Sequence, residues 1–295
     1  MAIECRDVSY IYSEGSGFEI QALHQINLTI PDGKFIGLIG HTGSGKSTLI
    51  QHLNGLLHAT AGDILYDGES IYAEGYSLRK LRSQVGLVFQ YPEHQLFEAT
   101  VLDDVMFGPK NLGLSVEEQK ERAITALGQV GIEESLFDAS PFELSGGQKR
   151  RVAIAGVLAM QPKVLILDEP TAGLDPQGKK EILGEIAKLQ KEQQITVVFV
   201  THCMEDVAEY ADLILVMNHG KVAFYDTPAR VFAHKEELKD LGLDVPQVTL
   251  VMQELHEIGL PVSADVITLK QAKDQILRVF AANASSRDEE VACDA

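Results

Sequence analysis

One octapeptide decides the fold, Gly40-His41-Thr42-Gly43-Ser44-Gly45-Lys46-Ser47. It has the spacing GxxxxGK followed by Ser or Thr, with an apolar strand at residues 34–39 before it and an apolar helical run from Thr48 after it. Glycines at these positions allow successive backbone N–H groups to converge on a phosphate, and the helix N-terminus adds positive charge. The stretch therefore predicts a phosphate-binding loop between a buried strand and a helix.

Two side chains of this loop have predicted roles toward a nucleotide. Lys46 is expected to hold the β and γ phosphates of ATP, and the Ser47 hydroxyl is expected to bind Mg²⁺. The alternative is a glycine-rich turn that binds nothing, but the four fixed positions match by chance in only about one such chain in a hundred. We therefore expect residues 40–48 to bind ATP together with Mg²⁺.

Four apolar runs of strand length lie along the chain, at residues 35–39, 164–167, 196–200 and 213–217. Because helical patterns separate them, they indicate a mainly parallel sheet that is covered on both faces. Two further segments alternate apolar with polar side chains and predict an antiparallel β part near the N-terminus, residues 3–12 and 26–30. The expected fold class is α/β, of the P-loop NTPase type.

Periodicity divides the chain into parts. The main domain is predicted at residues 1–243, and amphipathic helical patterns predict a helical subdomain inserted at residues 91–161. Residues 244–284 form a small C-terminal module, in which Gly259-Leu260-Pro261 separates two helix-like stretches. Residues 285–295 are polar and acidic without periodicity, which predicts a flexible tail.

Composition limits what the chain binds. Its 295 residues carry a formal net charge of −18, which repels nucleic acid and anionic lipid, so we expect no nucleic-acid partner. The longest apolar runs are too short for direct membrane insertion, because a spanning helix needs about 20 residues. Cys5, Cys203 and Cys293 are widely spaced and indicate neither a disulfide framework nor a zinc site. With no signal sequence, the chain is expected in the cytosol.

The apolar run at residues 164–167 ends in two acids, Asp168 and Glu169. Adjacent carboxylates at the end of a buried strand are costly unless a cation or a water binds them. Asp168 is expected to steady Mg²⁺, and Glu169 is expected to polarise the attacking water as a general base. The alternative is an acidic turn without function. The presence of the phosphate loop favours the catalytic interpretation over this alternative.

A second candidate anion site is the run Leu144-Ser145-Gly146-Gly147-Gln148, which precedes a helical pattern. Ser145 fits the N-cap position, and the two glycines leave backbone N–H groups uncovered. These features predict a helix terminus that binds an anion. By itself the run also fits an ordinary N-cap followed by flexible glycines.

This LSGGQ run, placed between a phosphate loop and an Asp-Glu strand, resembles the signature of ATP-binding cassette (ABC) proteins. The resemblance implies that Gln90 touches the metal and senses a transmembrane partner, and that Asp175 is the aspartate of the D-loop. It implies that His202 is the switch histidine on the γ-phosphate, the alternative being a satisfied turn residue. Tyr12 resembles the aromatic residue that stacks on adenine, although it also fits strand packing beside Tyr10.

The resemblance also implies a dimer. Each ATP is held between the phosphate loop of one subunit and the LSGGQ run of the other, so one chain provides two half-sites. The second ABC ATPase subunit is a paralogue or another copy of this chain, and the resemblance favours a paralogue. Since LSGGQ, Glu169 and His202 are all present, we expect both half-sites to be competent.

Residues 89–97 and 104–114 narrow the resemblance. They contain PEHQLF and FGPKNLGL, which are similar to the ATPases of energy-coupling factor (ECF) transporters, and to the second ATPase of heterodimeric systems more than to the first. The resemblance implies import of vitamins or transition metal ions with two partners, a transmembrane coupling subunit and a membrane-embedded substrate-binding subunit. It implies a docking groove beside residues 90–107 and a peripheral location at the cytoplasmic face of the cell membrane.

Three alternatives bear on these assignments. The C-terminal module either helps to hold two ATPases together, as the resemblance implies, or packs on its own domain. A soluble ABC ATPase of DNA repair or translation is opposed by the single cassette and by the lack of a coiled coil, a zinc hook or a basic linker. A regulator that never hydrolyses ATP is opposed by Glu169 and His202.

Overall fold

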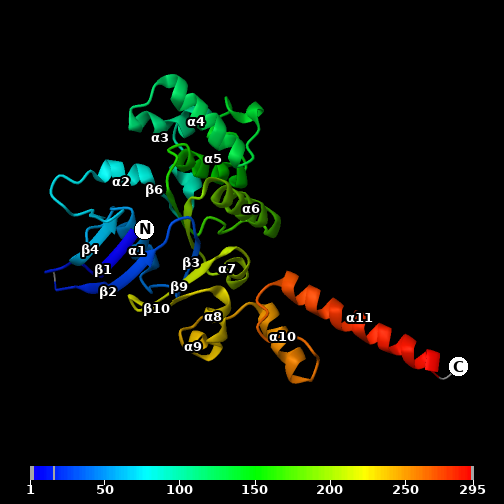
Figure 1. Ribbon diagram of the computed structural model, residues 1–295. Coiled ribbons are helices and arrows are strands. Elements are labelled where there is room, and N and C mark those ends of the chain that lie inside the picture. The colour runs from blue at the N-terminus through cyan, green and yellow to red at the C-terminus, as the bar shows by residue number, and fades with distance from the viewer. Residues whose placement is uncertain (1–2, 16, 294–295) are drawn as a thin grey trace.

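The computed structural model describes residues 3–15 and 17–293, with side chains as far as residue 281. Two β-sheets form the middle of the molecule, a group of helices lies at one end, and the C-terminal helices lie at the other (Figure 1). Within the described residues, no helix combines the length and the apolar character needed to cross a bilayer.

The central sheet has six strands in the order β10-β9-β3-β8-β7-β6. Its strands are β3 (Phe35–Ile39), β6 (Val85–Val88), β7 (Val164–Asp168), β8 (Thr196–Val200), β9 (Leu213–Asn218) and β10 (Lys221–Asp226). All pairings are parallel except that of β10 with β9. Every residue of β3, β7 and β8 is buried, as expected for strands covered on both faces. The predicted parallel sheet is confirmed, but β6 was not predicted.

The register brings the carboxyl ends of neighbouring strands to one edge of this sheet. Leu38 of β3 lies opposite Val200 of β8 and Leu215 of β9, and Asp168 of β7 also lies opposite Val200. The phosphate loop after β3, the acids at the end of β7 and the segment after β8 therefore share this edge. The helices that connect the strands include α6 (Pro176–Gln193) and α7 (Met204–Tyr210).

The second sheet is antiparallel, with the order β2-β1-β4-β5. Its strands are β1 (Ile3–Tyr12), β2 (Ile20–Ile30), β4 (Ala61–Tyr66) and β5 (Glu69–Ser70). Apolar side chains of this sheet share one buried core with helix α1 (Lys46–Leu53) and with the central sheet, including Val8, Ile26, Leu49 and Ile166. The predicted antiparallel β part is confirmed, and it packs directly beside the helix that follows the phosphate loop.

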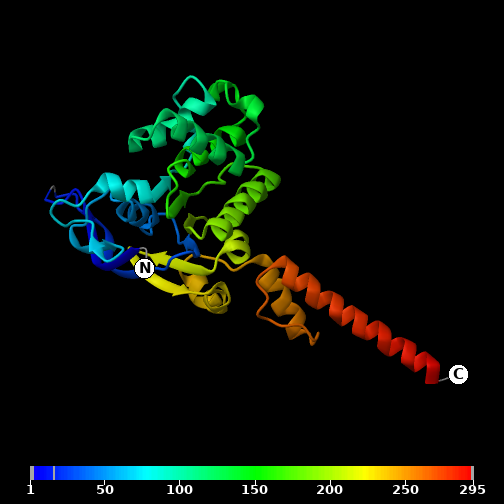
Figure 2. The same ribbon diagram turned by 45° about the horizontal axis from the view of Figure 1, so that its top comes forward.

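The helical lobe lies beyond β6 (Figure 2). It contains the helices α3 (Val101–Leu112), α4 (Val116–Gln129) and α5 (Gly146–Leu158). It also contains the 3₁₀ turns η1 (Pro92–Gln95), η2 (Glu134–Leu136) and η3 (Pro141–Glu143). Helix α2 (Leu78–Gln84) lies outside this lobe and leads into β6. Helices α3, α4 and α5 each begin after a hydroxyl N-cap, Thr100, Ser115 and Ser145 respectively. This lobe matches the inserted helical subdomain predicted from the sequence.

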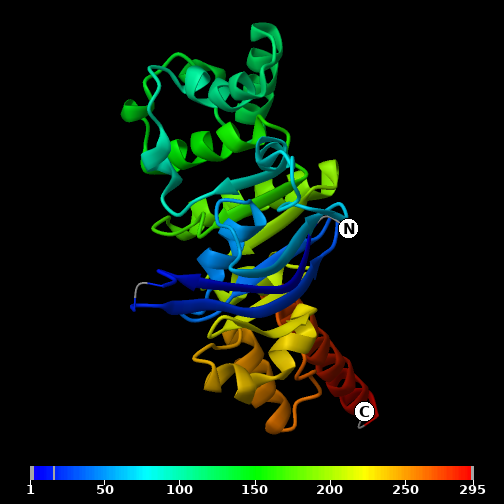
Figure 3. The same cartoon turned by 90° about the vertical axis from the view of Figure 1, so that its left-hand side faces the viewer.

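The C-terminal helices pack at the end opposite the helical lobe (Figure 3). They are α8 (Pro228–Ala233), α9 (Lys235–Asp240), α10 (Gln247–Glu257) and α11 (Leu269–Cys293). Four buried residues form a small core of their own, Met252, Val262, Val266 and Ala272. The backbone N–H of Gln247 donates to Glu205 Oε1 of α7 over 3.3 Å, so this module is bonded to the segment that follows β8.

Helix α11 extends past the start of the predicted tail at residue 285. The sequence from Leu269 to Cys293 contains no glycine and no proline, so nothing in it interrupts the helical hydrogen-bond ladder. The backbone of residues 285–293 is accordingly helical, and residues 294 and 295 lie outside the described part of the chain.

Candidate nucleotide-binding site

The phosphate loop requires glycine at two positions. Gly40 and Gly45 have φ angles of 152° and 102°, which disfavour other residues. A Cβ atom on Gly40 would lie 2.4 Å from the carbonyl oxygen of Met217, and one on Gly45 would lie 2.7 Å from that of Ala22. Because these obstacles are backbone atoms, a side chain at either position would displace the loop. Thr42 and Gly43 lie exposed at its tip.

The turn between β9 and β10 supports the loop from one side. His41 Nε2 lies 3.1 Å from Asn218 Oδ1, and the His41 ring centroid lies 4.8 Å from that of His219. The backbone N–H of Gly220 donates to the Ser44 carbonyl over 2.9 Å. Sequence reasoning missed this support, since 177 residues separate His41 from Asn218.

Lys46 is buried inside the loop, with 6% of its surface exposed. Its Nζ donates to the carbonyl oxygens of Gly40 over 2.7 Å and His41 over 3.0 Å. Burial lowers the pKa of Lys46, while the nearby carboxylates of Glu169 and Asp168 act in the opposite direction. The ammonium group therefore sits between the loop carbonyls and two acids, where it is placed to meet phosphate oxygens.

Ser47 and Asp168 provide neighbouring oxygen atoms. Their side chains lie close enough to interact, although they belong to α1 and β7. The pKa of Asp168 is raised, first by burial and then by the charge of Glu169, while Ser47 and Lys46 oppose the rise. A hydroxyl and a carboxylate side by side suit Mg²⁺, which prefers oxygen ligands. Among the described residues, no cluster of three or more His, Cys, Asp or Glu side chains offers another metal site.

Glu169 lies between Gln90 and His202. Gln90 Nε2 donates to Glu169 Oε2 over 2.9 Å, and His202 Nε2 lies 2.8 Å from Glu169 Oε1. Glu169 has a φ angle of 47°, and its backbone N–H donates to the Val200 carbonyl over 3.1 Å. A non-glycine residue in this conformation is held there by its surroundings. The structure thus brings together three residues that the sequence assigns to the γ-phosphate end of the site.

Tyr12 approaches the other end of the loop. Its hydroxyl lies 3.1 Å from Thr48 Oγ1, and its ring packs edge-on against Tyr10 at a centroid distance of 4.8 Å. Tyr12 retains 37% exposure. Tyr12 therefore packs within its sheet while remaining partly exposed, and its contact to Thr48 places it beside the helix that begins in the loop.

The LSGGQ run and Asp175, also predicted to take part in nucleotide binding, lie at the N-termini of helices α5 and α6. Ser145 caps α5, and the capping box is completed by Gln148, whose Oε1 accepts from the Ser145 N–H over 2.9 Å. Asp175 caps α6 by accepting from the Gly178 N–H over 2.7 Å. Ser145, Gly147 and Gln148 line a hollow in the helical lobe that includes none of residues 40–48. The structure therefore does not join the LSGGQ run, which includes Gly146, to the phosphate loop of the same chain.

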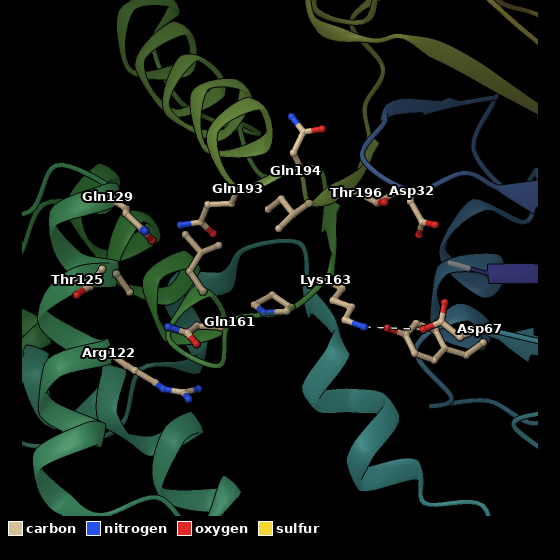
Figure 4. Close-up of a pocket in the computed structure, with 15 residues that line it drawn as sticks. Asp32, Asp67, Arg122, Thr125, Gln129, Gln161, Lys163, Gln193, Gln194 and Thr196 are labelled. Atoms are coloured by element: carbon tan, nitrogen blue, oxygen red, sulfur yellow. Dashed lines mark ion pairs between the residues drawn. The ribbon is translucent and has the colours of Figure 1, made fainter. Parts of the chain in front are cut away.

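Another hollow, of about 600 Å³, lies at the opposite edge of the central sheet (Figure 4). Lys163 and Thr196, just before and at the start of β7 and β8, line it together with Arg122 of α4. Lys163 Nζ lies 3.9 Å from Asp67 Oδ2 there. None of the candidate nucleotide residues borders this hollow, so it does not belong to the site.

The family model for the ABC transporter matches residues 23–172. The chain belongs to the ABC transporter family. The energy-coupling factor transporter ATP-binding protein EcfA2 of Caldanaerobacter subterraneus subsp. tengcongensis is 56% identical over 278 residues, which cover 94% of this chain and 97% of that protein. The family and the resemblance to ECF ATPases predicted from the sequence are confirmed.

Solved structures agree with this assignment. The cbiO1 protein of Clostridium perfringens, described as part of the ABC transporter complex cbiONQ, is 42% identical, with a TM-score of 0.73 over 87% of this chain and 98% of that one. A dimeric post-hydrolysis state of the ATP-binding cassette MJ0796, bound to ADP and Pi, is 31% identical, with a TM-score of 0.68 over 77% and 98% of the two chains. The α/β P-loop fold class is thus confirmed, while the roles of individual residues stay predictions.

Proposed function

We propose that this ABC-family protein is the ATP-binding and ATP-hydrolysing subunit of an ECF importer that takes up vitamins or transition metal ions. The observation that carries the proposal is the carboxylate of Glu169, held by Gln90 and His202 at the edge of the sheet where Lys46 and Asp168 also lie. A base, a switch residue and a phosphate-binding lysine are the groups that ATP hydrolysis requires.

ATP is expected to bind with its phosphates in the loop and its adenine near Tyr12. Backbone N–H groups of residues 40–48 face the β-phosphate, and the Lys46 ammonium reaches the β and γ phosphates. Ser47, Asp168 and the amide oxygen of Gln90 would hold Mg²⁺, since Gln90 uses Nε2 for its bond to Glu169. When bound, Mg²⁺ neutralises negative charge on the phosphates.

Glu169 acts as the general base in this scheme. It takes a proton from the water that attacks the γ-phosphorus, the bond from that phosphorus to the β–γ bridging oxygen breaks, and ADP and phosphate are released. The His202 side chain, 2.8 Å from the carboxylate, orients the base and lies where the γ-phosphate is expected. Glu169 has a left-handed backbone conformation, and its carboxylate contacts both neighbours.

A second ATPase subunit completes the site. The LSGGQ run caps α5 in the helical lobe and shares no hollow with the phosphate loop of its own chain, so its exposed N-terminus is available to an ATP held by a partner. The dimeric relative bound to ADP and Pi supports such an arrangement. The partner is a paralogue or a second copy of this chain.

An exposed groove of about 560 Å³ is suited to the transmembrane coupling subunit, which in turn carries the membrane-embedded substrate-binding subunit. Phe97 and Phe107 border it with 57% and 39% exposure, and their rings meet edge-on at 5.0 Å. Exposed aromatic side chains beside a hollow are typical of protein interfaces. Docking there would hold the chain at the cytoplasmic face of the membrane as a peripheral subunit.

Replacement of the base tests the proposed activity. Glu169→Gln should lower the ATPase rate by at least about 100-fold, because a general base contributes about 10²–10⁴-fold, while ATP affinity stays within about threefold. Steady-state phosphate release and titration with a fluorescent ATP analogue measure the two quantities. Glu192→Gln, an exposed change on α6, is the control and should leave both unchanged. An unaltered ATPase rate in Glu169→Gln would contradict the proposal.

A further inference from the structure

Arg150 is a buried cation in the first turns of α5, two residues beyond the LSGGQ run, with 3% of its side chain exposed. Its guanidinium makes a two-pronged ion pair with Glu93, from Nη2 to Oε1 over 2.8 Å and from Nε to Oε2 over 3.1 Å. Its third nitrogen, Nη1, donates to the carbonyl oxygen of Ala172 over 2.5 Å. One side chain thus joins three separate segments of the chain.

Both partners of Arg150 belong to segments that hold Glu169. Glu93 lies in η1, three residues after Gln90, whose amide bonds the Glu169 carboxylate over 2.9 Å. Ala172 lies three residues after Glu169 and donates its N–H to the Glu169 carbonyl over 3.1 Å. Two links therefore connect these segments. One is the Gln90–Glu169 hydrogen bond, and the other is Arg150, which bonds both Glu93 and Ala172.

The geometry of this link depends on arginine. A planar guanidinium offers two parallel N–H groups to a carboxylate and a further one to a carbonyl, whereas a lysine ammonium is a single point charge. Glu93 is charged in this pair: burial raises its pKa, but the bonds from Arg150 outweigh burial and lower it. Because the pair is largely buried, replacing either Arg150 or Glu93 with a neutral residue would leave the other charge unpaired and release the link between the two segments.

The same link borders the exposed groove. Gln95 and Leu96 follow Glu93 in the chain, Val152 and Ala153 follow Arg150, and all four line the groove described above. Glu93 and Arg150 therefore each lie within three residues of side chains that line the groove.

We infer that Arg150 is a positioning residue for ATP hydrolysis, which fixes η1 and the turn after Glu169 relative to α5 and so keeps Gln90 against the Glu169 carboxylate. The inference rests on the proposed ATPase activity. Arg150 acts through Glu93 and Ala172 and does not itself reach the phosphate loop. Its loss should therefore disturb the hydrolytic step and leave ATP binding by Lys46 intact.

The test compares kcat and KM for ATP in the purified ATPase dimer in which this chain carries Arg150→Lys, Glu93→Gln or both. Each single variant should lower kcat about 5- to 20-fold, with KM within about twofold of the original. The double variant should be no slower than the slower single variant, because both changes break one link. If Arg150→Lys fails to fold, Glu93→Gln keeps the shape of the side chain and carries the test alone.

Arg151→Lys is the matched control. Arg151 is the next residue of α5 and also bonds one carbonyl, Val130 O over 3.1 Å, and one carboxylate, Glu181 Oε2 over 2.5 Å, but neither partner segment holds Glu169. It should leave kcat within about twofold, and it should lower the melting temperature less than Arg150→Lys, because its ion pair is more exposed.

Three outcomes would overturn the inference: an unchanged kcat in Arg150→Lys and Glu93→Gln, equal losses in kcat and in ATP binding, or an equal loss of kcat in Arg151→Lys. Its failure is distinct from failure of the proposed function. If Glu169→Gln abolishes hydrolysis while Arg150→Lys does not affect it, only the role of Arg150 is lost. If Glu169→Gln has no effect, the proposed function is lost.

Discussion

Lys46 combines a buried ammonium group with a pKa that burial has lowered. The charged form is therefore disfavoured by the fold at this position, and the residue is retained at a cost in stability. Buried charged groups with shifted pKa values are common at ligand-binding sites, where the charge contributes to ligand binding and not to stability.

Lys46→Ala should weaken ATP binding roughly 10- to 150-fold, since hydrogen bonds to charged groups are worth about 1.5–3 kcal/mol. The melting temperature should fall little, because the substitution also removes a buried charge. Fluorescence titration and thermal unfolding measure the two effects. Lys163→Ala, at the opposite edge of the sheet, is the control for the loss of a lysine. Normal ATP affinity in Lys46→Ala would refute the role given to this residue.

At the residue scale the sequence proposed candidate residues for the site but did not indicate how they contact one another. The phosphate loop, Asp168 and Glu169 were proposed from short contiguous patterns, and His202 was proposed from the resemblance to ABC proteins. The Arg150–Glu93 pair joins residues 57 positions apart, and the Gln90–Glu169 bond joins residues 79 apart. Such pairs depend on how the helical lobe packs on the sheet, and no local spacing encodes them. The only signal near Arg150 was its place directly after LSGGQK.

Helices α4 and α5 offer an internal comparison, because both begin with a complete capping box. Ser115 is closed by Glu118, and Ser145 is closed by Gln148. Loss of either serine hydroxyl should cost about 0.5–2 kcal/mol of stability, with alanine as the replacement. Only α5 carries the LSGGQ run.

Ser145→Ala and Ser115→Ala should therefore lower the free energy of unfolding by similar amounts but differ in function. We expect Ser145→Ala to reduce the ATPase rate of the dimer by about tenfold, because the proposed shared site places the N-terminus of α5 against the ATP of the partner subunit. Ser115→Ala should retain the original rate. Denaturant unfolding and phosphate release measure both effects, and equal ATPase rates in the two variants would count against a shared site.

The helices and strands that could be predicted from the sequence were those with a long or strongly apolar run of residues. Strands β3, β7, β8 and β9 are nearly continuous apolar runs and were predicted, whereas β6 has only the four residues of Val85–Val88, with a glycine among them. Its pairing with β7 secures it in the sheet. Helix α11 continues into the predicted tail because the sequence there contains no glycine or proline that would interrupt it.

At the scale of the whole molecule, the C-terminal module has apolar side chains that its own core does not cover. Leu277 and Phe280 of α11 are 55% and 69% exposed, and Ile258 after α10 is 75% exposed. The sequence also allowed the module to pack on its own domain, and residues such as Val245 do so. The exposed remainder is consistent with a contact to the second ATPase subunit.

A double substitution, Leu277→Glu with Phe280→Glu, should weaken association of the ATPase subunits by at least tenfold in the absence of nucleotide. Burial of two large apolar side chains contributes about 1.5–3 kcal/mol each, and the changes replace them with charge. Sedimentation measures the association, and the melting temperature should stay within a few degrees. Val116→Glu, on an equally exposed apolar residue of α4, is the control. Undiminished association would show that the module packs only on its own domain.

The position of Glu169 between two neighbours has a consequence for control. Gln90 belongs to the segment that continues into the groove at the helical end of the molecule. His202 belongs to the segment that continues into α7, where Glu205 is bonded to Gln247 of the C-terminal module. The carboxylate therefore has one physical input from each end of the protein, and its two oxygen atoms receive them separately. A displacement of either the helical lobe or the C-terminal module would therefore be expected to change the contacts of this carboxylate, one oxygen atom at a time.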